Sequence, residues 1–432
     1  MGAVEQAALR QGSGQAPAWV RERREIAAKR FAEVGFPTTK LEDWRFTNVA
    51  PVAEAKFPLA EGSFVQASAL VSKVAVPGSL RLAIVNGQFA AGLSDLSALP
   101  KGVRIAGLRD GARDGTVGLE EHLGKVFSLD AHPFAALNTS HLDDGVAIFV
   151  TAGAVVETPI HIVTVTGSDD KAVTAHPRVL VVAAANSQVR IAQTFIGAAD
   201  SVYFNNAVVE VVVGEGAIVD YYTDQRESER AFHIANLQAH VEAKGVFASH
   251  AFSTGAKIQR HDIGIGLKGE GADCTMNGVY LADGDRLMDT HTSLDHAMPH
   301  CTSHEIYKGI LAGKAKAVFN GRIIVRLDAQ KTDAKQTNRA LLLSDDATIN
   351  SNPQLEIFAD DVKCTHGAAV GQLDEEAMFY LQARGLTRIE ARDMLLHAFA
   401  GEVLDGLKIP ALREQIETNF FTALARDVAL TA

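Results

Sequence analysis

The chain has 432 residues, of which 47% are apolar and 22% are charged. This length predicts two or three domains, and the composition is typical of a globular protein with a sizeable core. The formal net charge of −11 argues against a surface that binds nucleic acid or anionic membranes. No apolar run approaches the roughly 20 residues of a membrane span, and no basic-then-apolar signal peptide is present. The three cysteines (Cys274, Cys301 and Cys364) form no disulfide framework, which is typical of a cytoplasmic protein.

Residues 1–125 mix helical and strand patterns, and we expect an N-terminal α/β domain rich in helix. Apolar residues at helical spacing predict a first helix that ends at Gly35 and Pro37, namely Val20, Ala27, Phe31 and Val34. Because the net charge is negative, the basic residues of this helix are predicted to form a solvated face: Arg21, Arg23, Arg24, Lys29 and Arg30. The following segment, LEDWRFTNV, supplies Trp44 and Phe46 as predicted packing anchors.

From about Val146 the chain consists of short runs rich in Val, Ile and Ala, such as VAIFV, PIHIVTV and VVEVVVG. Turn clusters such as Gly214-Glu-Gly216 separate the runs, and helical periodicity is almost absent. The turns recur every roughly 25–30 residues, which favours coils of a parallel β-helix over a hairpin meander. The pattern alone leaves a β-sandwich open. We therefore expect a β-rich core domain over residues 126–371.

Two motifs in this region resemble nucleotide-binding sequences but lack the required context. The segment from Gly264 to Gly269 spells GxGxxG, which binds a dinucleotide only where it joins a strand to a helix. Here GEGADCTMNGVYL follows, which is typical of a turn and a strand. The segment ending at Lys125 has the wrong spacing for a phosphate-binding loop and lacks its Ser or Thr. We therefore expect no nucleotide site in the chain itself.

Histidines are dense near the end of the β-rich region. Neither the helical H-E-x-x-H spacing nor a CxxC accompanies them, so polar packing between coils is favoured over a metal site. This set is His291, His296, His300 and His304, with Cys301 in the same segment.

Residues 372–432 have helical periodicity and are expected to form a C-terminal helical domain. Gly385 is placed to end a first helix, Thr387 and Glu390 form a capping box for a second, and Pro410 opens a third. Apolar residues lie on two sides of these helices, which is more apolar surface than a small helical domain can bury alone. The domain is therefore expected either to pack on the β-domain or to dock a partner.

The junction between the β-rich and helical regions contains Asp361, Cys364 and His366. In an extended strand, residues two apart share a face, so the thiol and the imidazole are expected side by side. Such a pair binds a soft metal or forms a reactive thiolate. The alternative interpretation is a core position, because Val362 has the same parity and free cysteines are often buried.

The junction sequence ADDVKCTHGAAVGQLDEE, followed by MFYLQARGL, resembles the SufD family of iron–sulfur cluster assembly scaffold subunits. The upstream run DAQKTDAKQTNRALLLSDDATINSNPQLEI and the N-terminal LEDWRFTN resemble the same family. The resemblance covers most of the chain and implies a mainly β protein with a right-handed parallel β-helix core. It implies a scaffold without catalytic residues of its own, which pairs with its paralogue SufB through the β-helix. It assigns no role to Cys274 or Cys301, which we expect to be core thiols.

The resemblance also implies partners and site residues. Cys364 and His366 match family positions at the SufB interface and would be metal ligands for a transient iron–sulfur cluster shared with SufB. The C-terminal helices would dock the ABC-type ATPase SufC, and we assign this role to Leu395, Leu396, Phe399 and Val403. A cysteine desulfurase and a sulfur carrier would supply sulfur, and the assembled complex can carry a flavin. Because a cluster usually takes four thiolates, the three dispersed cysteines make ligands shared across an interface necessary.

Two other functions are alternatives to this one. A carbohydrate-active β-helix enzyme would need carboxylates clustered along one strand face and normally a secretion signal, and the sequence has neither. A purely structural interaction protein would place Cys364 and His366 in the core.

Overall fold

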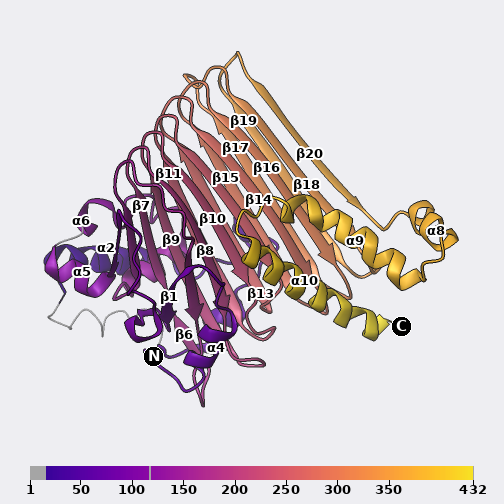
Figure 1. The fold of residues 1–432 in the computed structure, drawn as a ribbon, viewed down its shortest axis with the longest axis horizontal. Helices are drawn as coiled ribbons and strands as arrows, with labels where there is room; N and C mark the ends of the chain where they lie inside the picture. Colours follow the sequence, from indigo (N-terminus) through magenta and orange to yellow (C-terminus); the bar gives the residue numbers. More distant parts are fainter. Residues whose placement is uncertain (1–15, 116–117, 432) are drawn as a thin grey trace.

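The computed structural model describes residues 16–115 and 118–431, which form a long solenoid of strands with helices at both ends (Figure 1). The α-helices are α2 (Ala18–Val34), α3 (Ala50–Ala55), α4 (Ala67–Lys73), α5 (Leu108–Asp114), α6 (Leu119–His122), α7 (Pro133–Ser140), α8 (Glu375–Ala383), α9 (Arg388–Leu404) and α10 (Pro410–Thr431). Short 3-10 helices lie at Glu42–Trp44 and Ala91–Leu93.

Strands make up 39% of the chain and helices 24%, so the expectation of a mainly β protein is confirmed. The strands are β1 (Leu80–Val85), β2 (Gln88–Phe89), β3 (Val103–Gly107), β4 (Val146–Val150), β5 (Ile160–Val165), β6 (Val173–Ala175), β7 (Arg178–Ala183), β8 (Gln188–Ile196), β9 (Tyr203–Val213), β10 (Ile218–Gln225), β11 (Phe232–Val241), β12 (Val246–Ser253), β13 (Ile258–Leu267), β14 (Asp273–Ala282), β15 (Leu287–His296), β16 (Thr302–Leu311), β17 (Lys316–Val325), β18 (Asp333–Leu342), β19 (Thr348–Ile357) and β20 (Lys363–Gly371).

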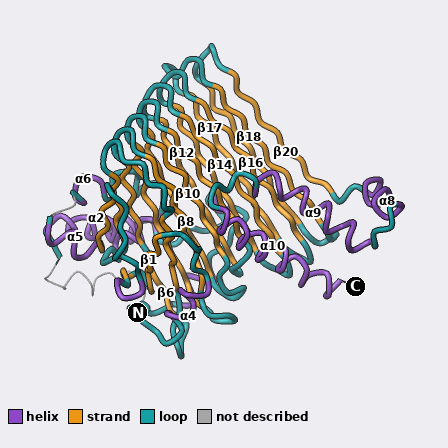
Figure 2. The backbone as a smooth tube through the Cα atoms, viewed as in Figure 1, coloured by secondary structure: helices purple, strands orange, loops and turns teal. Residues whose placement is uncertain are grey.

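The strands form two ten-stranded sheets that alternate along the chain. One sheet has the order β2-β1-β5-β8-β10-β12-β14-β16-β18-β20, and the other contains β19-β17-β15-β13-β11-β9-β7-β4-β3 with β6 beside β9. From β7 onward the paired strands are parallel, and their connecting turns stack in a row along one side of the solenoid (Figure 2). Polar contacts between neighbouring coils join residues 28 to 31 apart, close to the predicted recurrence. The predicted parallel β-helix core is confirmed, and the β-sandwich is excluded.

Inward-facing side chains of the two sheets fill the solenoid. On β16, the buried residues Ser303, Glu305 and Tyr307 alternate with more exposed neighbours, as expected for a strand with one face in a core. The largest core cluster is dominated by Val, Ile and Leu from both sheets, including Val181, Val211 and Ile263. Beyond Tyr307 the outward residues of β16 are buried as well, because helices cover that part of the sheet.

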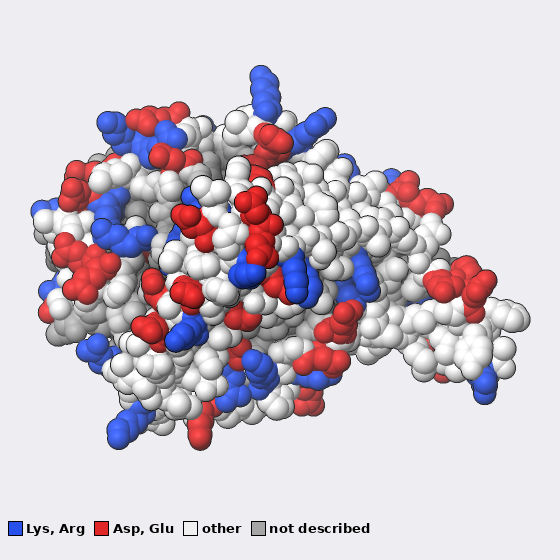
Figure 3. All heavy atoms as spheres, turned by 90° about the horizontal axis from the view of Figure 1, so that it is seen from above, with Lys and Arg blue, Asp and Glu red and all other residues white. Residues whose placement is uncertain are grey.

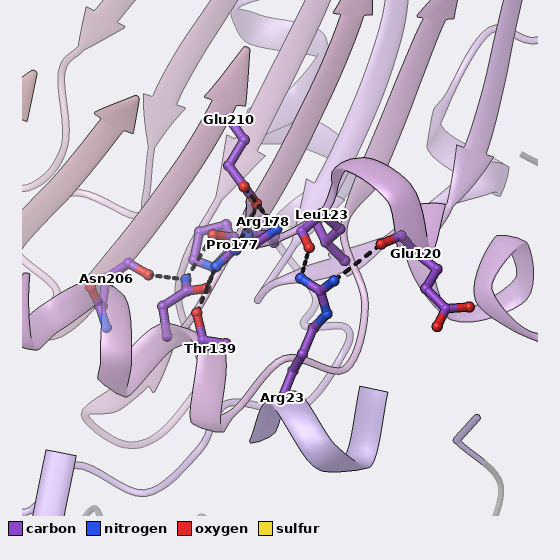
Figure 4. A network of polar contacts seen from close by, with 10 residues as sticks. Arg23, Glu120, Leu123, Thr139, Pro177, Arg178, Asn206 and Glu210 are labelled. Atoms are coloured by element: carbon purple, nitrogen blue, oxygen red, sulfur yellow. Dashed lines mark hydrogen bonds and ion pairs between the residues drawn. The ribbon is translucent and has the colours of Figure 1, made fainter. Parts of the chain in front are cut away.

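A buried ion pair joins the N-terminal region to the solenoid (Figure 4). Arg178 Nη2 lies 2.6 Å from Glu210 Oε1, and both side chains are fully buried. Arg178 Nη1 also donates to Asn138 Oδ1 at 2.9 Å and to Thr139 Oγ1 at 3.1 Å. The backbone N–H of Gly124 donates to both Glu210 oxygens, at 2.9 and 2.8 Å. The two buried charges are therefore paired and hydrogen-bonded, which offsets the cost of their desolvation.

The prediction that the basic residues of the first helix form a solvated face is wrong for Arg23 and Arg24. Arg24 is 2% exposed, and its Nε donates to the carbonyl oxygen of Leu142. Arg23 donates to the carbonyl oxygens of Leu123 and Glu120 (Figure 4). The segment between α5 and β4 folds back over α2, and the two guanidinium groups bind backbone carbonyl oxygens of that segment.

The two predicted aromatic anchors behave differently. Trp44 is buried, and the Arg260 guanidinium carbon lies 3.7 Å from the centroid of its ring, so its anchoring role is confirmed. Phe46 is 49% exposed, so the same prediction is wrong for it.

The C-terminal helices α9 and α10 pack on the outer face of the β2-to-β20 sheet (Figure 1). The apolar contact comprises Leu396, Ala400, Val403, Leu404, Leu412, Ile416 and Phe420 from the helices, with Tyr222, Phe252, Val279, Leu281 and Ile310 from the sheet. The predicted capping box of Thr387 and Glu390 is present, Pro410 begins α10, and Gly385 follows α8 with φ of 98°. Helix α8 extends past the last coil (Figure 1).

The predicted domain limits fall at identifiable points of the chain. Residue 125 lies between α6 and α7, but strands before it join both sheets, because β1 pairs with β5 and β3 with β4. Residue 371 is the last of β20.

Within the described ranges, no helix is both long and apolar enough to cross a bilayer. On the face in Figure 3, acidic and basic side chains are intermingled over the solenoid.

Candidate functional site

Cys364 and His366 lie on β20, the last strand of its sheet. In register with β18, Cys364 pairs with Ala334 and His366 with Gln336. Ala334 and Gln336 are buried, and Cys364 packs against the main core cluster. Cys364 and His366 therefore share one face of β20, as the sequence predicted, and this face has the parity of the solenoid interior.

The thiol and the imidazole differ in exposure. Cys364 is half-buried, and His366 is exposed. Burial raises the pKa of the Cys364 thiol, a backbone hydrogen bond with Ala334 acts in the opposite direction, and the Asp333 charge raises it further. The raised pKa favours the protonated thiol, and a nearby positive charge would stabilise the thiolate.

The last coil of the solenoid is open. In the described part of the chain, no strand pairs with the outer side of β19 or β20. Apolar side chains on and around these strands are exposed, including Leu327 at 65%, Phe358 at 60% and Val370 at 50%. Unpaired strand edges with exposed apolar residues are typical of places where a further strand adds. Cys364 and His366 lie on this edge.

The other two cysteines lie inside the solenoid. Cys274 and Cys301 are buried, and the Cys301 thiol donates to the carbonyl oxygen of Gly269 at 3.4 Å. Burial raises the pKa of both thiols. The expectation that they are core thiols is confirmed, and neither lies on the strand of Cys364.

The dense histidine set does not converge on one point. His296 faces the interior, where its Nε2 lies 2.9 Å from Ser303 Oγ, and His291 lies on the other face near Asp289 and Arg260. Among the described residues, no group of three or more His, Cys, Asp or Glu side chains is arranged to hold a metal ion. The GxGxxG segment lies in β13 and the turn after it, where no helix begins.

The four residues assigned to ATPase docking differ in position. Leu396 and Val403 are 0% and 1% exposed because they pack on the solenoid, whereas Leu395 and Phe399 are half-buried. The most exposed apolar side chains of α8 and α9 are others, which sequence reasoning did not select: Phe379 at 73%, Tyr380 at 58%, Ile389 at 55% and Met394 at 50%. Phe379, Tyr380 and Met394 lie off the main apolar stripe of each helix, and that position was the available signal. Ile389 lies on the same stripe as Leu396 but near the beginning of α9, where it is exposed.

Two buried polar residues next to the site were also missed. Glu305 on β16 and Gln336 on β18 are 1% and 2% exposed, and Gln336 Nε2 donates to Glu305 Oε2 at 2.7 Å. An alignment of successive coils would have placed Glu305, Gln336 and His366 at the same position of three stacked strands, because Glu305 pairs with Gln336 and Gln336 with His366.

The solenoid and its flanking helices define a class of protein, the parallel β-helix proteins. The core-domain model of the SufBD proteins ("SUF system FeS cluster assembly, SufBD core domain") matches residues 164–399, and the SufBD N-terminal region matches residues 6–162. The chain belongs to the SufBD family.

Individual relatives match over most of their length. An iron-sulfur cluster assembly SufBD family protein of Synechocystis is 32% identical, over 91% of this chain and 89% of the relative. The iron-sulfur cluster assembly protein SufD of Escherichia coli is 30% identical, over 88% of each chain. SufD of Bacillus subtilis is 28% identical over 93% of each chain. The resemblance to the SufD family is thereby confirmed.

Proposed function

We propose that the chain is a scaffold subunit, without enzymatic activity of its own, of a cytoplasmic complex that assembles iron–sulfur clusters. The observation that carries the proposal is the position of Cys364 and His366, adjacent on the inward face of the last strand. This edge is open, so both side chains lie where a second protein can add ligands. An iron–sulfur cluster usually has four protein ligands, and this chain offers two at this edge. Ligands from a partner would supply the others.

The partner at this edge is proposed to be the paralogue SufB. The backbone N–H and C=O groups of β19 and β20 can pair with strands of another solenoid, which would extend both sheets. The transient cluster is then the cargo of the complex, with Cys364 and His366 as ligands from this chain. A desulfurase and a sulfur carrier would deliver the sulfur, and a flavin can bind elsewhere on the complex.

The ATPase SufC is proposed to dock on the exposed apolar residues of α8 and α9. Leu396 and Val403 pack on the solenoid and are not available to a partner. We therefore assign the docking surface to the exposed residues Phe379, Tyr380, Ile389 and Met394. Leu395 and Phe399 are half-buried and border this surface. Exposed apolar side chains of this size are typical of protein interfaces.

Co-expression of the chain with SufB and SufC of the same organism, followed by iron and sulfide analysis of the purified complex, tests the proposal. We expect a complex that contains acid-labile sulfide. A complex with neither iron nor sulfide would favour a purely structural interaction protein, and failure to co-purify would reject the scaffold role. For the isolated chain purified in air, we expect no stoichiometric cluster, because it provides too few ligands.

A further inference from the structure

A buried amide lies directly behind His366. Gln336 is 2% exposed, and its Nε2 donates to Glu305 Oε2 at 2.7 Å. Glu305 is 1% exposed and lies on β16, one coil before Gln336 along the solenoid. Burying two polar side chains costs free energy unless their hydrogen bonds are made. Each buried polar atom of this pair therefore needs a hydrogen-bonding partner.

The opposite sheet leaves room for this amide. Gly321 on β17 is buried, and a Cβ added there would lie 2.3 Å from Gln336 Nε2 and 2.8 Å from its Cδ. The φ angle of Gly321 is not in the left-handed region, so its backbone does not require glycine. The lack of a side chain at residue 321 instead makes space for Gln336. The amide is thus fixed by a donor–acceptor contact on one side and by a matched space on the other.

The acceptor end of the same amide is unused. None of the described residues donates a hydrogen bond to Gln336 Oε1, although this atom is buried. Because the oxygen and nitrogen of an amide diverge, the bond from Nε2 to Glu305 leaves Oε1 directed away from Glu305. The inward-facing residue at the same register on the next strand, β20, is His366. Buried polar atoms without partners in native proteins often mark functional positions.

We propose that Gln336 is a positioning residue for His366: its Oε1 accepts a hydrogen bond from one ring N–H, which fixes the imidazole tautomer and directs the other ring nitrogen to the open edge. Histidine ligands commonly donate their second N–H to an acceptor that sets the tautomer and orientation of the ring. Glu305 acts one step further away by holding the Gln336 amide. The purpose of this arrangement rests on the proposed role of His366 in cluster assembly.

The ring nitrogens of His366 report this hydrogen bond directly. We suggest ¹⁵N NMR of the full chain labelled at histidine, with the His366 signals assigned by their loss in His366→Gln. We expect the wild-type ring to show one protonated and one unprotonated nitrogen, with well-separated shifts. In Gln336→Met this separation should collapse toward the averaged shifts of a ring that exchanges between tautomers. His296, bound to Ser303 Oγ at 2.9 Å, is the internal control and should not change.

Two further variants separate positioning from general packing. Gly321→Ala removes no polar group but displaces the amide, so it should also collapse the His366 separation. The exchange Glu305→Gln with Gln336→Glu reverses the donor and acceptor within the pair but keeps an acceptor oxygen toward His366, so it should restore the separation. Equal His366 shifts in the wild type and in Gln336→Met would overturn the proposal, as would a failure of the exchanged pair to differ from Gln336→Met.

This measurement is independent of the proposed function, because it uses the isolated chain without iron, sulfide or partners. If the His366 tautomer is fixed but the complex contains no sulfide, the proposed function is rejected and the hydrogen bond between Gln336 and His366 is retained. Sulfide in the complex with a freely exchanging tautomer would reject the role of Gln336 alone.

Discussion

Lys308 Nζ lies 2.5 Å from Glu402 Oε2 and 2.7 Å from the carbonyl oxygen of Phe399. Lys308 belongs to β16, and the other two residues belong to α9. The same strand carries Glu305, which holds Gln336 behind the candidate site. This contact therefore fixes the proposed ATPase-docking helices to the coil that supports the Cys–His edge.

Replacing Lys308 by Met should keep the apolar contact with Phe399 and remove both hydrogen bonds. Because Glu402 is half exposed, we expect a cost of only about 1 kcal/mol. The hydrogen bond from Lys308 lowers the pKa of Glu402. Its contribution to stability is therefore present above the unfolded pKa of about 4.5 and is lost as the pH falls through the folded value. Urea unfolding at pH 7 and pH 4 tests this expectation, and an equal cost of the variant at both pH values would contradict it.

Breaking the buried Arg178–Glu210 pair should be much more costly. In Arg178→Met, Glu210 loses its bonds from Arg178 and remains fully buried, so we expect a loss of about 3–5 kcal/mol. Adding Glu210→Gln removes the unpaired charge, so the double variant should be less destabilised than the sum of the two single variants. Chemical unfolding of the three variants measures the coupling. Strictly additive losses would show that the two residues do not act as a pair.

Glu305 should make stability depend on pH in the opposite direction from an ordinary ion-paired carboxylate. Burial raises the pKa of Glu305 to about 7, so the folded state retains a proton that the unfolded state releases near pH 4.5. The contribution of this residue to stability therefore falls as the pH rises from 4.5 to 7 and is constant above that.

Glu305→Gln cannot ionise, so it should gain stability relative to the wild type across this range, by up to about 3 kcal/mol. Unfolding free energies of the wild type and of Glu305→Gln at several pH values test this expectation. Parallel curves for the wild type and Glu305→Gln would contradict it.

The proposed docking surface can be separated from the packing surface of the same helix. Ile389→Ser should abolish co-purification with SufC and leave the melting temperature unchanged, because Ile389 is 55% exposed. Leu396→Ala should lower stability by about 2–5 kcal/mol, because Leu396 is fully buried on the solenoid. Retention of SufC by both Ile389→Ser and Phe379→Ser would place the docking site elsewhere.

Local patterns in the sequence favoured the solenoid and predicted the helix ends, and the family resemblance was needed to choose the β-helix over a β-sandwich. The turn recurrence gave the coil length, and Thr387, Glu390 and Pro410 marked helix starts because caps depend on neighbouring residues alone. The parity of Cys364 and His366 also follows from the two-residue repeat of a strand.

Features that depend on which segments meet in space could not be predicted in this way. Arg24 looked like a surface residue until the segment around Leu142 covered it. The face of α9 that packs on the sheet contains Leu396 and Val403, and helical periodicity did not distinguish it from a docking face. The Glu305–Gln336 contact spans 31 residues and becomes visible only when the coils are placed in register.

We propose that Cys364 and His366 perform cluster chemistry at the partner edge and are not merely core residues. The most direct measurement is acid-labile sulfide per assembled complex for Cys364→Ser and His366→Ala, together with the melting temperature of each isolated variant. The proposal predicts normal melting temperatures, normal assembly with SufB and SufC, and a loss of sulfide that is larger for His366→Ala. Normal sulfide content with lowered melting temperatures would contradict it and assign both residues to the core.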